Sequence, residues 1–299
     1  MAIPKAQLET WANPGALTTS AAAYASIRNA LLKSTSPVAD LGLDIYLQGS
    51  YANSTNIYGD SDIDVVALYS ATFSEDISLL TPAERQINAS AGFVTATYTW
   101  TNLRDDVLKA LRSHYGNSSV TPGKKAIKVT TGNGLKPADV IPAIQFRRYA
   151  TFPNASEATA HWGIKFFDSS NNPIVNYPKY HRERGEDKNS ATRTGGRYKP
   201  TIRIFKNFRN YLIDHRLLAE GIASSYHIEC ALHNVPDYLF IGDYTVTIPA
   251  IITHLLTTAF ISLRCQNGVT DLIGTAATQW SGNDFTTFII AAQNGWEDF

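Results

Sequence analysis

The chain has few of the residues that build disulfide scaffolds or cysteine-based metal sites. Among its 299 residues there are two cysteines, Cys230 and Cys265, far apart and without companion ligands at metal-binding spacing. This argues against a disulfide-stapled fold and against a zinc site, and it suits a reducing compartment. We therefore expect a cytoplasmic protein whose core is large enough for one large domain or two lobes.

The chain also lacks net charge and long apolar runs. Lys and Arg together number 26, as do Asp and Glu, so no global field draws the protein onto nucleic acid or membranes. The N-terminal residues contain no signal-peptide core. The most apolar late stretch, residues 248–263, is interrupted by His254 and threonines and is too short to cross a bilayer comfortably. We expect a buried helix there and no membrane partner.

One stretch, residues 47–68, is the most informative. An apolar run ends in Gly49 and Ser50, a polar loop follows, and Asp62 and Asp64 open a second apolar run. Strand side chains alternate, so Asp62 and Asp64 converge on one spot, and two close carboxylates repel unless a cation lies between them. Mg²⁺ prefers such oxygen ligands, and the Gly-Ser backbone would cradle a triphosphate. The pattern indicates metal-assisted nucleotidyl transfer; the alternative is a solvated turn.

Other candidates lie farther along the chain. Asp139 opens another apolar strand and would help to hold a metal near an attacking hydroxyl, unless it merely shapes a turn. Lys206 lies opposite an apolar helical stripe and would pair with phosphates, although an isolated Lys is usually solvated. Ser225 would bond a phosphate, and Tyr226 would stack on a base unless it is a core aromatic.

The apolar periodicity predicts an α/β protein. Strands are expected at residues 43–49, 62–69, 125–130 and 139–146, a hairpin at 163–177, and helices at 14–33, 101–115, from 198 onward, 226–232, 249–263 and 285–292. The polar stretch 181–196 is expected to be a surface loop or lid. A catalytic lobe with an N-terminal helix would occupy residues 1–160, and a mainly helical nucleotide-binding lobe residues 161–299, with a cleft between them.

These motifs resemble the nucleotidyltransferase superfamily, and most fully the bacterial cyclic GMP-AMP synthase-like enzymes, the CD-NTases of CBASS anti-phage systems. The resemblance is carried by residues 48–62, 138–140, 177–179, 203–209 and 224–229, and the opening residues are similar to clade E. It implies a bilobed nucleotidyltransferase fold, with a polymerase β-like mixed sheet lobe and a helical lobe. It also implies a synthase of cyclic di- or trinucleotides that releases pyrophosphate.

The resemblance assigns roles to individual residues. Asp62, Asp64 and Asp139 would be catalytic and would bind Mg²⁺, for which Mn²⁺ can substitute. Nucleotide-binding residues would be Gln48, Gly49, Ser50, Lys206, Ser225 and Tyr226. The acceptor pocket would include Ile141 and Gln145, because both follow Asp139 on its strand and Gln145 can donate and accept hydrogen bonds.

Substrates would be ATP plus UTP, GTP or a second ATP, and neither the bases nor the linkage is decided. A product-sensing effector would not bind this chain directly. Cations outnumber acids between Lys179 and Arg216, and Arg182, Arg184 and Arg193 are candidates for binding an activating structured RNA; the alternative is a solvated surface. A linear oligonucleotide synthetase, an RNA-modifying nucleotidyltransferase and a catalytically silent RNA-binding module also remain open.

Overall fold

The chain alternates between two structural units instead of completing one before the other. The computed structural model describes residues 3–15, 18–59, 62–130, 132 and 134–298. One unit, here called the helical unit, comprises Met1–Leu17, Gly49–Asp60 and Lys179–Phe299. The other, the sheet unit, comprises Thr18–Gln48 and Ser61–Pro178.

The predicted division into residues 1–160 and 161–299 differs from this arrangement. Strand β6 (Thr159–Phe167) pairs with β5, and β7 (Pro173–Asn176) pairs with β6, so hydrogen bonding keeps both strands in the sheet unit. Helix α1 (Lys5–Ala12) buries Leu8 in the core of the helical unit. Residues 49–60 belong to that unit through hydrogen bonds that no sequence pattern predicts.

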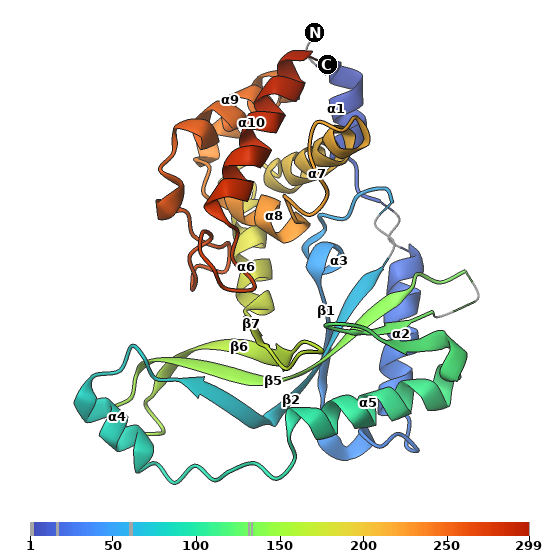
Figure 1. Cartoon of the computed structure of the whole chain (residues 1–299), viewed down its shortest axis with the longest axis vertical. Coiled ribbons are helices and arrows are strands. Elements are labelled where there is room, and N and C mark those ends of the chain that lie inside the picture. Colours follow the sequence, from blue (N-terminus) through green and yellow to red (C-terminus); the bar gives the residue numbers. More distant parts are fainter. Residues whose placement is uncertain (1–2, 16–17, 60–61, 131, 133, 299) are drawn as a thin grey trace. The chain divides into compact units, whose positions relative to one another are not determined.

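The sheet unit is built on a mixed sheet (Figure 1). Among the described residues it has seven strands, of which five lie side by side as β1 (Asp44–Gln48), β2 (Ile63–Asp76), β5 (Ala138–Thr151), β4 (Ile127–Val129) and β3 (Val120–Pro122). The central pair β2 and β5 is parallel, and the other pairs are antiparallel. The predicted strands and the hairpin at 163–177 are confirmed, with β2 and β5 longer than expected.

Two helices of the sheet unit, α2 (Thr18–Leu32) and α5 (Trp100–Tyr115), pack on each other and on β2 and β5 (Figure 1). Helix α5 begins after a capping box in which the Thr99 hydroxyl accepts from the Asn102 N–H and the Asn102 side chain accepts from the Thr99 N–H. It ends at Gly116, whose φ of 83° favours glycine. A shorter helix, α4 (Pro82–Ala89), lies elsewhere in this unit.

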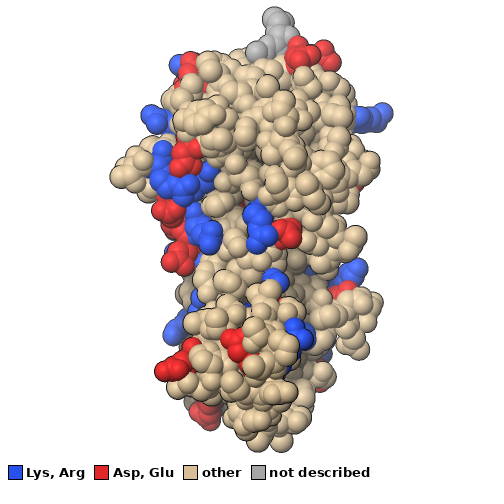
Figure 2. All heavy atoms as spheres, turned by 90° about the vertical axis from the view of Figure 1, so that its left-hand side faces the viewer, with Lys and Arg blue, Asp and Glu red and all other residues tan. Residues whose placement is uncertain are grey.

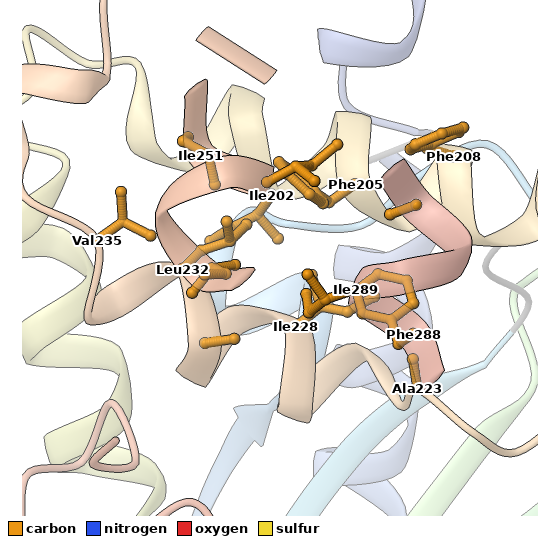
Figure 3. Close-up of a cluster of buried hydrophobic side chains, with 14 of the residues drawn as sticks. Ile202, Phe205, Phe208, Ala223, Ile228, Leu232, Val235, Ile251, Phe288 and Ile289 are labelled. Carbon is orange, nitrogen blue, oxygen red and sulfur yellow. The ribbon is translucent and has the colours of Figure 1, made fainter. Parts of the chain in front are cut away.

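The helical unit has α7 (Tyr198–Asp214) in its core. The predicted stripe of Ile202, Phe205, Phe208 and Leu212 is buried there, which confirms that prediction. The stripe meets apolar side chains of α8 (Ser225–His233) and α10 (Gly282–Asp298), as Figure 3 shows for Ile228, Leu232, Phe288 and Ile289. Burying each such side chain contributes about 1.5–3 kcal/mol.

The expected surface loop at residues 181–196 is wrong for its first half. Helix α6 (Pro178–Lys188) occupies residues 181–188, and turns follow up to residue 196. The buried side of α6 carries His181 and Lys188 instead of an apolar stripe. Lys188 is only 2% exposed, and its ammonium donates to the Val235 carbonyl at 2.7 Å and to the Asp237 carboxylate at 2.9 Å. Because polar partners replace apolar contacts, this helix has no periodic signal.

The last predicted helix before the C-terminal one is shifted. Helix α9 (Tyr244–Thr257) starts after Asp243, whose carboxylate caps the Thr245 N–H, and Pro249 lies inside the helix instead of opening it. After Thr257 the backbone leaves the α-helix, so the expected end at residue 263 is also wrong. None of the helices in the described ranges combines the length and apolar character that crossing a bilayer demands. The predicted α/β class is confirmed.

Candidate active site

Three predicted carboxylates meet at one end of the sheet unit. Asp64 on β2 lies directly opposite Asp139 on β5 in the parallel register. Neighbouring strands are about 4.8 Å apart, so these side chains are adjacent on one face. Asp62 lies just before β2 begins at Ile63, and its carboxylate raises the pKa of Asp139, so it is near this pair. The fold thus brings together acids from two distant segments, as the sequence predicted.

Polar residues extend this pair across the sheet. Gln48 on β1 lies opposite Asp64, and Lys128 on β4 lies opposite Asp139. Directly opposed residues share a face, so Gln48, Asp64, Asp139 and Lys128 form a polar row. Farther along the strands, that face carries an apolar cluster: Val66, Leu68, Ile141, Ala143, Ile164, Phe166 and Ile174. A polar row that ends an apolar face is a ready platform for a charged ligand.

Asp139 has one carboxylate oxygen in an unfavourable position. Its Oδ1 is buried and has no hydrogen-bond partner in the described part of the chain. Burial raises the pKa of Asp139, the Lys128 ammonium lowers it and the Asp62 carboxylate raises it, for a net increase above the usual value. A buried carboxylate oxygen without a partner costs free energy that a bound cation would offset.

The carboxylates fit a divalent cation in donor chemistry. Mg²⁺ and Mn²⁺ take oxygen ligands, and the Oδ1 of Asp139 has no partner in the described chain. As the side chains stand, however, no three His, Cys, Asp or Glu residues in the described ranges are arranged to hold a metal ion. Side-chain rotations of Asp62, Asp64 and Asp139 are therefore needed to bring all three onto one ion.

The two acceptor-pocket candidates lie on the same face of β5 as Asp139. Ile141 is 6% exposed and belongs to the apolar cluster, so it is a core residue as well as a candidate. Gln145 is half-buried, and its Oε1 accepts from the Arg147 Nε at 3.0 Å. Their role in reading a base stays a prediction.

Gly49 and Ser50 directly follow β1 and open the short helix α3 (Gly49–Asn53). Gly49 has a φ of 68°, in the left-handed region where a side chain is disfavoured by about 1 kcal/mol or more. Ser50 is half-buried, and its carbonyl accepts from the Thr55 N–H at 2.9 Å. The backbone therefore requires glycine where the sequence placed a phosphate-binding turn, while phosphate binding itself stays a prediction.

Lys206 occupies a different environment from the one its sequence context suggested. It is completely buried, and its Nζ donates to the Thr55 carbonyl at 2.8 Å. In this position the ammonium faces the segment that follows α3 and not solvent. The predicted phosphate contact of Lys206 stays a prediction, because the ammonium is buried here and donates to a backbone carbonyl.

Ser225 and Tyr226 form the first turn of α8. The Ser224 hydroxyl caps this helix by accepting from the His227 N–H at 3.1 Å. The Ser225 hydroxyl accepts from Arg209 at a long 3.4 Å. The Tyr226 ring stacks on the ring of His181, with centroids 5.1 Å apart and planes 25° apart. Tyr226 also packs against the core of the helical unit, as the alternative expects, so stacking on a base stays a prediction.

The three candidate RNA-binding arginines are exposed, but their environments differ. Arg193 forms ion pairs with Asp187 and Asp237, which balance its charge. Arg182 and Arg184 are exposed positions on α6. On the face shown in Figure 2, Lys and Arg are interspersed with Asp and Glu, without a continuous basic field. RNA binding by these residues stays a prediction.

The structure adds one buried acid to which the sequence motifs assign no role of its own. Glu229 of α8 is 3% exposed and accepts hydrogen bonds from Asn53 at 3.0 Å, from Thr55 at 2.5 Å and from His181 at 2.8 Å. The sequence feature that could have revealed this buried carboxylate is a single acid inside the apolar run from Ile228 to Leu232. A charge in such a run is buried only with partners.

Comparisons with known proteins agree with this geometry. Residues 183–297 match the family described as the cGAS/DncV-like nucleotidyltransferase C-terminal helical domain. The cyclic UMP-AMP synthase of Rhodothermus marinus is 41% identical over 298 residues, which are 99% of this chain and 98% of that protein. The cyclic nucleotide synthase CdnE01 of Staphylococcus haemolyticus is 40% identical over 305 residues, with 100% of both chains covered.

Solved structures give the same result. The Rhodothermus marinus CdnE c-UMP-AMP synthase with Apcpp and Upnpp matches 99% of this chain and 97% of its own, at a TM-score of 0.88 and 41% identity. The Elizabethkingia meningoseptica CdnE cyclic dinucleotide synthase with GTP and Apcpp matches 98% of each chain, at a TM-score of 0.77 and 28% identity. The chain therefore belongs to the cGAS/DncV-like nucleotidyltransferases, the CD-NTases, and within them to the CdnE enzymes.

Proposed function

We propose that this protein is a cyclic dinucleotide synthase, which joins NTPs with release of pyrophosphate and makes a second messenger for anti-phage signalling in the bacterial cytoplasm. The observation that carries the proposal is the register that sets Asp64 beside Asp139 on one face of the sheet. Its support is that relatives 40–41% identical across the whole chain are cyclic nucleotide synthases. The effector that senses the product would not contact this chain.

Two phosphodiester bonds have to form in succession. In each, a hydroxyl of one nucleotide attacks the α-phosphorus of a triphosphate and pyrophosphate leaves, so two NTPs give one cyclic dinucleotide and two pyrophosphates. Asp62, Asp64 and Asp139 would hold Mg²⁺, or Mn²⁺ in its place, which supplies charge neutralisation at the attacking and leaving oxygens. The Gly49 backbone and the Ser50 hydroxyl orient the triphosphate, and Tyr226 offers an aromatic face to the base.

The substrate pair is the part of the proposal that depends most on relatives. The Rhodothermus marinus enzyme makes cyclic UMP-AMP, and its structure holds analogues of ATP and UTP. A less similar relative, from Elizabethkingia meningoseptica, is a cyclic dipurine nucleotide synthase. We therefore propose ATP plus UTP as the substrates, with GTP or a second ATP as the competing partners.

A labelled-nucleotide assay tests the function. The purified protein is incubated with Mg²⁺ or Mn²⁺ and the four NTPs, each α-labelled in turn, and then with phosphatase. A phosphatase-resistant product that disappears in Asp64→Asn supports the proposal, and the labels that enter it name the bases. The matched control is Asp76→Asn, which removes an acid at the far end of the same strand, where it pairs with Arg148.

Two other outcomes of that assay would favour the alternatives. A phosphatase-sensitive ladder would indicate a linear oligonucleotide synthetase, and labelled RNA would indicate an RNA-modifying nucleotidyltransferase. No product with or without added RNA would favour a silent RNA-binding module. The three acids at one sheet end argue against that last function, because such a module has no use for clustered carboxylates.

Activation by structured RNA is a narrower part of the proposal. Arg182 and Arg184 are exposed cations of α6 that would contact phosphates. The test is the double charge reversal Arg182→Glu/Arg184→Glu, assayed with and without structured RNA at two salt concentrations. Loss of RNA stimulation with the RNA-free rate retained supports activation. Arg193→Glu is the poorer probe, because it would break the ion pairs with Asp187 and Asp237.

A further inference from the structure

Residues 49–60 lie between β1 and β2 in the sequence but belong to the helical unit. Two cations of α7 hold this segment by its backbone. The Lys206 Nζ donates to the Thr55 carbonyl at 2.8 Å, and the Arg203 Nη1 donates to the Ser54 carbonyl at 2.6 Å. The Gly15 N–H donates to the Asn56 carbonyl at 3.1 Å. The loop that begins with Gly49 and Ser50 is therefore anchored by helical-unit residues.

Glu229 holds the same segment by its side chains. Its Oε2 accepts from the Asn53 Nδ2 at 3.0 Å, and its Oε1 accepts from the Thr55 hydroxyl at 2.5 Å. Thr55 is thus held twice, by its carbonyl on Lys206 and by its hydroxyl on Glu229. Because Glu229 and Lys206 are both buried, their opposite charges reinforce this clamp in a medium of low dielectric.

The same carboxylate also controls the surroundings of Tyr226. The His181 Nε2 donates to the Glu229 Oε2 at 2.8 Å, and the ring of the same His181 stacks on the ring of Tyr226. Tyr226 precedes Glu229 by one helical turn on α8, so both side chains lie on neighbouring positions of that helix. Glu229 therefore connects the loop of Gly49 and Ser50 with the ring predicted to receive the base.

We propose that Glu229 is a positioning residue for NTP binding. It fixes residues 49–60 and Tyr226 in one preorganised geometry without touching the nucleotide. The inference rests on the proposed function, since that function gives Gly49, Ser50 and Tyr226 their roles. A site that is already ordered loses less conformational entropy when the nucleotide binds. Supporting residues of this kind typically change ligand affinity about 10-fold to 100-fold when removed.

A purely stabilising role explains the network less well. Replacing a buried ion pair by apolar residues of similar volume is often neutral or stabilising, so stability alone does not call for a buried Glu with four polar neighbours. The core around α7 and α8 is otherwise apolar and extensive. The Glu229 carboxylate adds defined geometry, because its two oxygens accept hydrogen bonds from Asn53, Thr55 and His181 at the same time.

The test compares Glu229→Gln with Asp237→Asn in the full-length protein. Asp237 is the matched control, because it also pairs with a buried Lys of the helical unit, Lys188. Its other ion pair is with Arg193, so neither of these ion pairs involves residues 49–60 or Tyr226. The readouts are the melting temperature, the Kd of the non-hydrolysable ATP analogue Apcpp, and KM and kcat for ATP. We expect Glu229→Gln to raise Kd and KM about tenfold or more with a smaller change in kcat. Asp237→Asn should lower the melting temperature and leave Kd and KM unchanged.

A second pair of variants keeps the test informative if Glu229→Gln folds poorly. Thr55→Val keeps the shape of the side chain and removes one hydrogen bond to Glu229, so it should raise the Apcpp Kd by a smaller factor. If both residues act through one network, Thr55→Val should add less than its own factor in the Glu229→Gln background. A folded Glu229→Gln with the wild-type Kd and KM overturns the proposal, as does an unchanged Kd in Thr55→Val when Glu229→Gln does not fold.

These readouts separate the positioning role from the proposed function. If the wild-type protein binds Apcpp but forms no cyclic product, the function fails, and the Kd comparison still decides the role of Glu229. If Asp64→Asn abolishes the product while Glu229→Gln keeps wild-type Kd and KM, the function stands and the positioning role is lost.

Discussion

Two acids, one in each unit, have opposite surroundings. In the sheet unit, Asp139 lies beside Asp64, and its Oδ1 has no hydrogen-bond partner among the described residues. In the helical unit, Glu229 accepts from three side chains and lies in the field of Lys206. The contrast distinguishes an acid that is left for a ligand from an acid that is used to hold the protein's own segments. The first should govern chemistry, and the second should govern geometry and stability.

The largest effect should come from the sheet unit. Asp64→Asn should lower the rate of product formation by about a thousandfold or more, because the variant loses charge where the reacting phosphate needs a cation. The melting temperature should stay within a few degrees of wild type, because Asn keeps nearly the size and shape of Asp. The check is to measure the rate of product formation and the melting temperature of Asp64→Asn beside those of Asp76→Asn. A large drop in melting temperature for Asp64→Asn would contradict the assignment of this acid to chemistry instead of stability.

The next effect should come from the helical unit and have the opposite character. Glu229→Ala should lower the free energy of unfolding by about 3–5 kcal/mol, because it leaves the Lys206 charge buried without its acid. Asp139→Asn should not lower it. Urea unfolding of both variants against wild type measures the difference. Equal losses would mean that the two acids are not used differently.

The pH dependence of stability should also differ in sign. Burial raises the pKa of Glu229, but the hydrogen bond and charge of His181, the Lys206 charge and the Thr55 hydroxyl leave it below its usual value. Its stabilising contribution is therefore present above pH 4.5, the ordinary value, and is lost as pH falls through the lower folded pKa.

Asp139 should behave in the reverse way. Its folded pKa is raised above the usual 3.8, so its ionised form destabilises the fold at neutral pH, and this penalty disappears as pH falls through the folded value toward 3.8. The measurement is the unfolding free energy of wild type minus that of Glu229→Gln, and of wild type minus that of Asp139→Asn, from pH 7 down to about pH 2. Slopes of the same sign would contradict the account.

The smallest effect concerns the turn between the two strands. Gly49→Ala should cost about 1 kcal/mol because its φ of 68° is left-handed, and it should also weaken Apcpp binding. Gly221→Ala is the control, since Gly221 has a φ of 84° in the helical unit and open space around it. Similar stability losses with weaker binding only in Gly49→Ala would sharpen the comparison; equal binding in both would remove Gly49 from the nucleotide site.

Local patterns predicted much of this structure. The strand that carries Asp64 and the apolar stripe of α7 depend on residues close in sequence, and both are confirmed in the described chain. The pairing of Asp64 with Asp139 was reachable because an acid opens each of two apolar strands. These features share one property, since each is written as periodicity in a short window.

What the sequence did not reveal depends on polar contacts between distant residues. Helix α6 was missed because His181 and Lys188 are buried against polar partners, which leaves no apolar period. The assignment of residues 49–60 to the helical unit follows from bonds that Thr55 makes to Lys206 and Glu229. No local pattern encodes such long-range pairing.

The central claim is that this CD-NTase closes two NTPs into a ring with the acids of the sheet unit. The most direct measurement is mass spectrometry of the phosphatase-resistant product formed from ATP and UTP by wild type and by Asp64→Asn. The account predicts a cyclic dinucleotide from wild type and none from the variant. Linear or phosphatase-sensitive products from wild type, or an equal amount of cyclic product from Asp64→Asn, would contradict it.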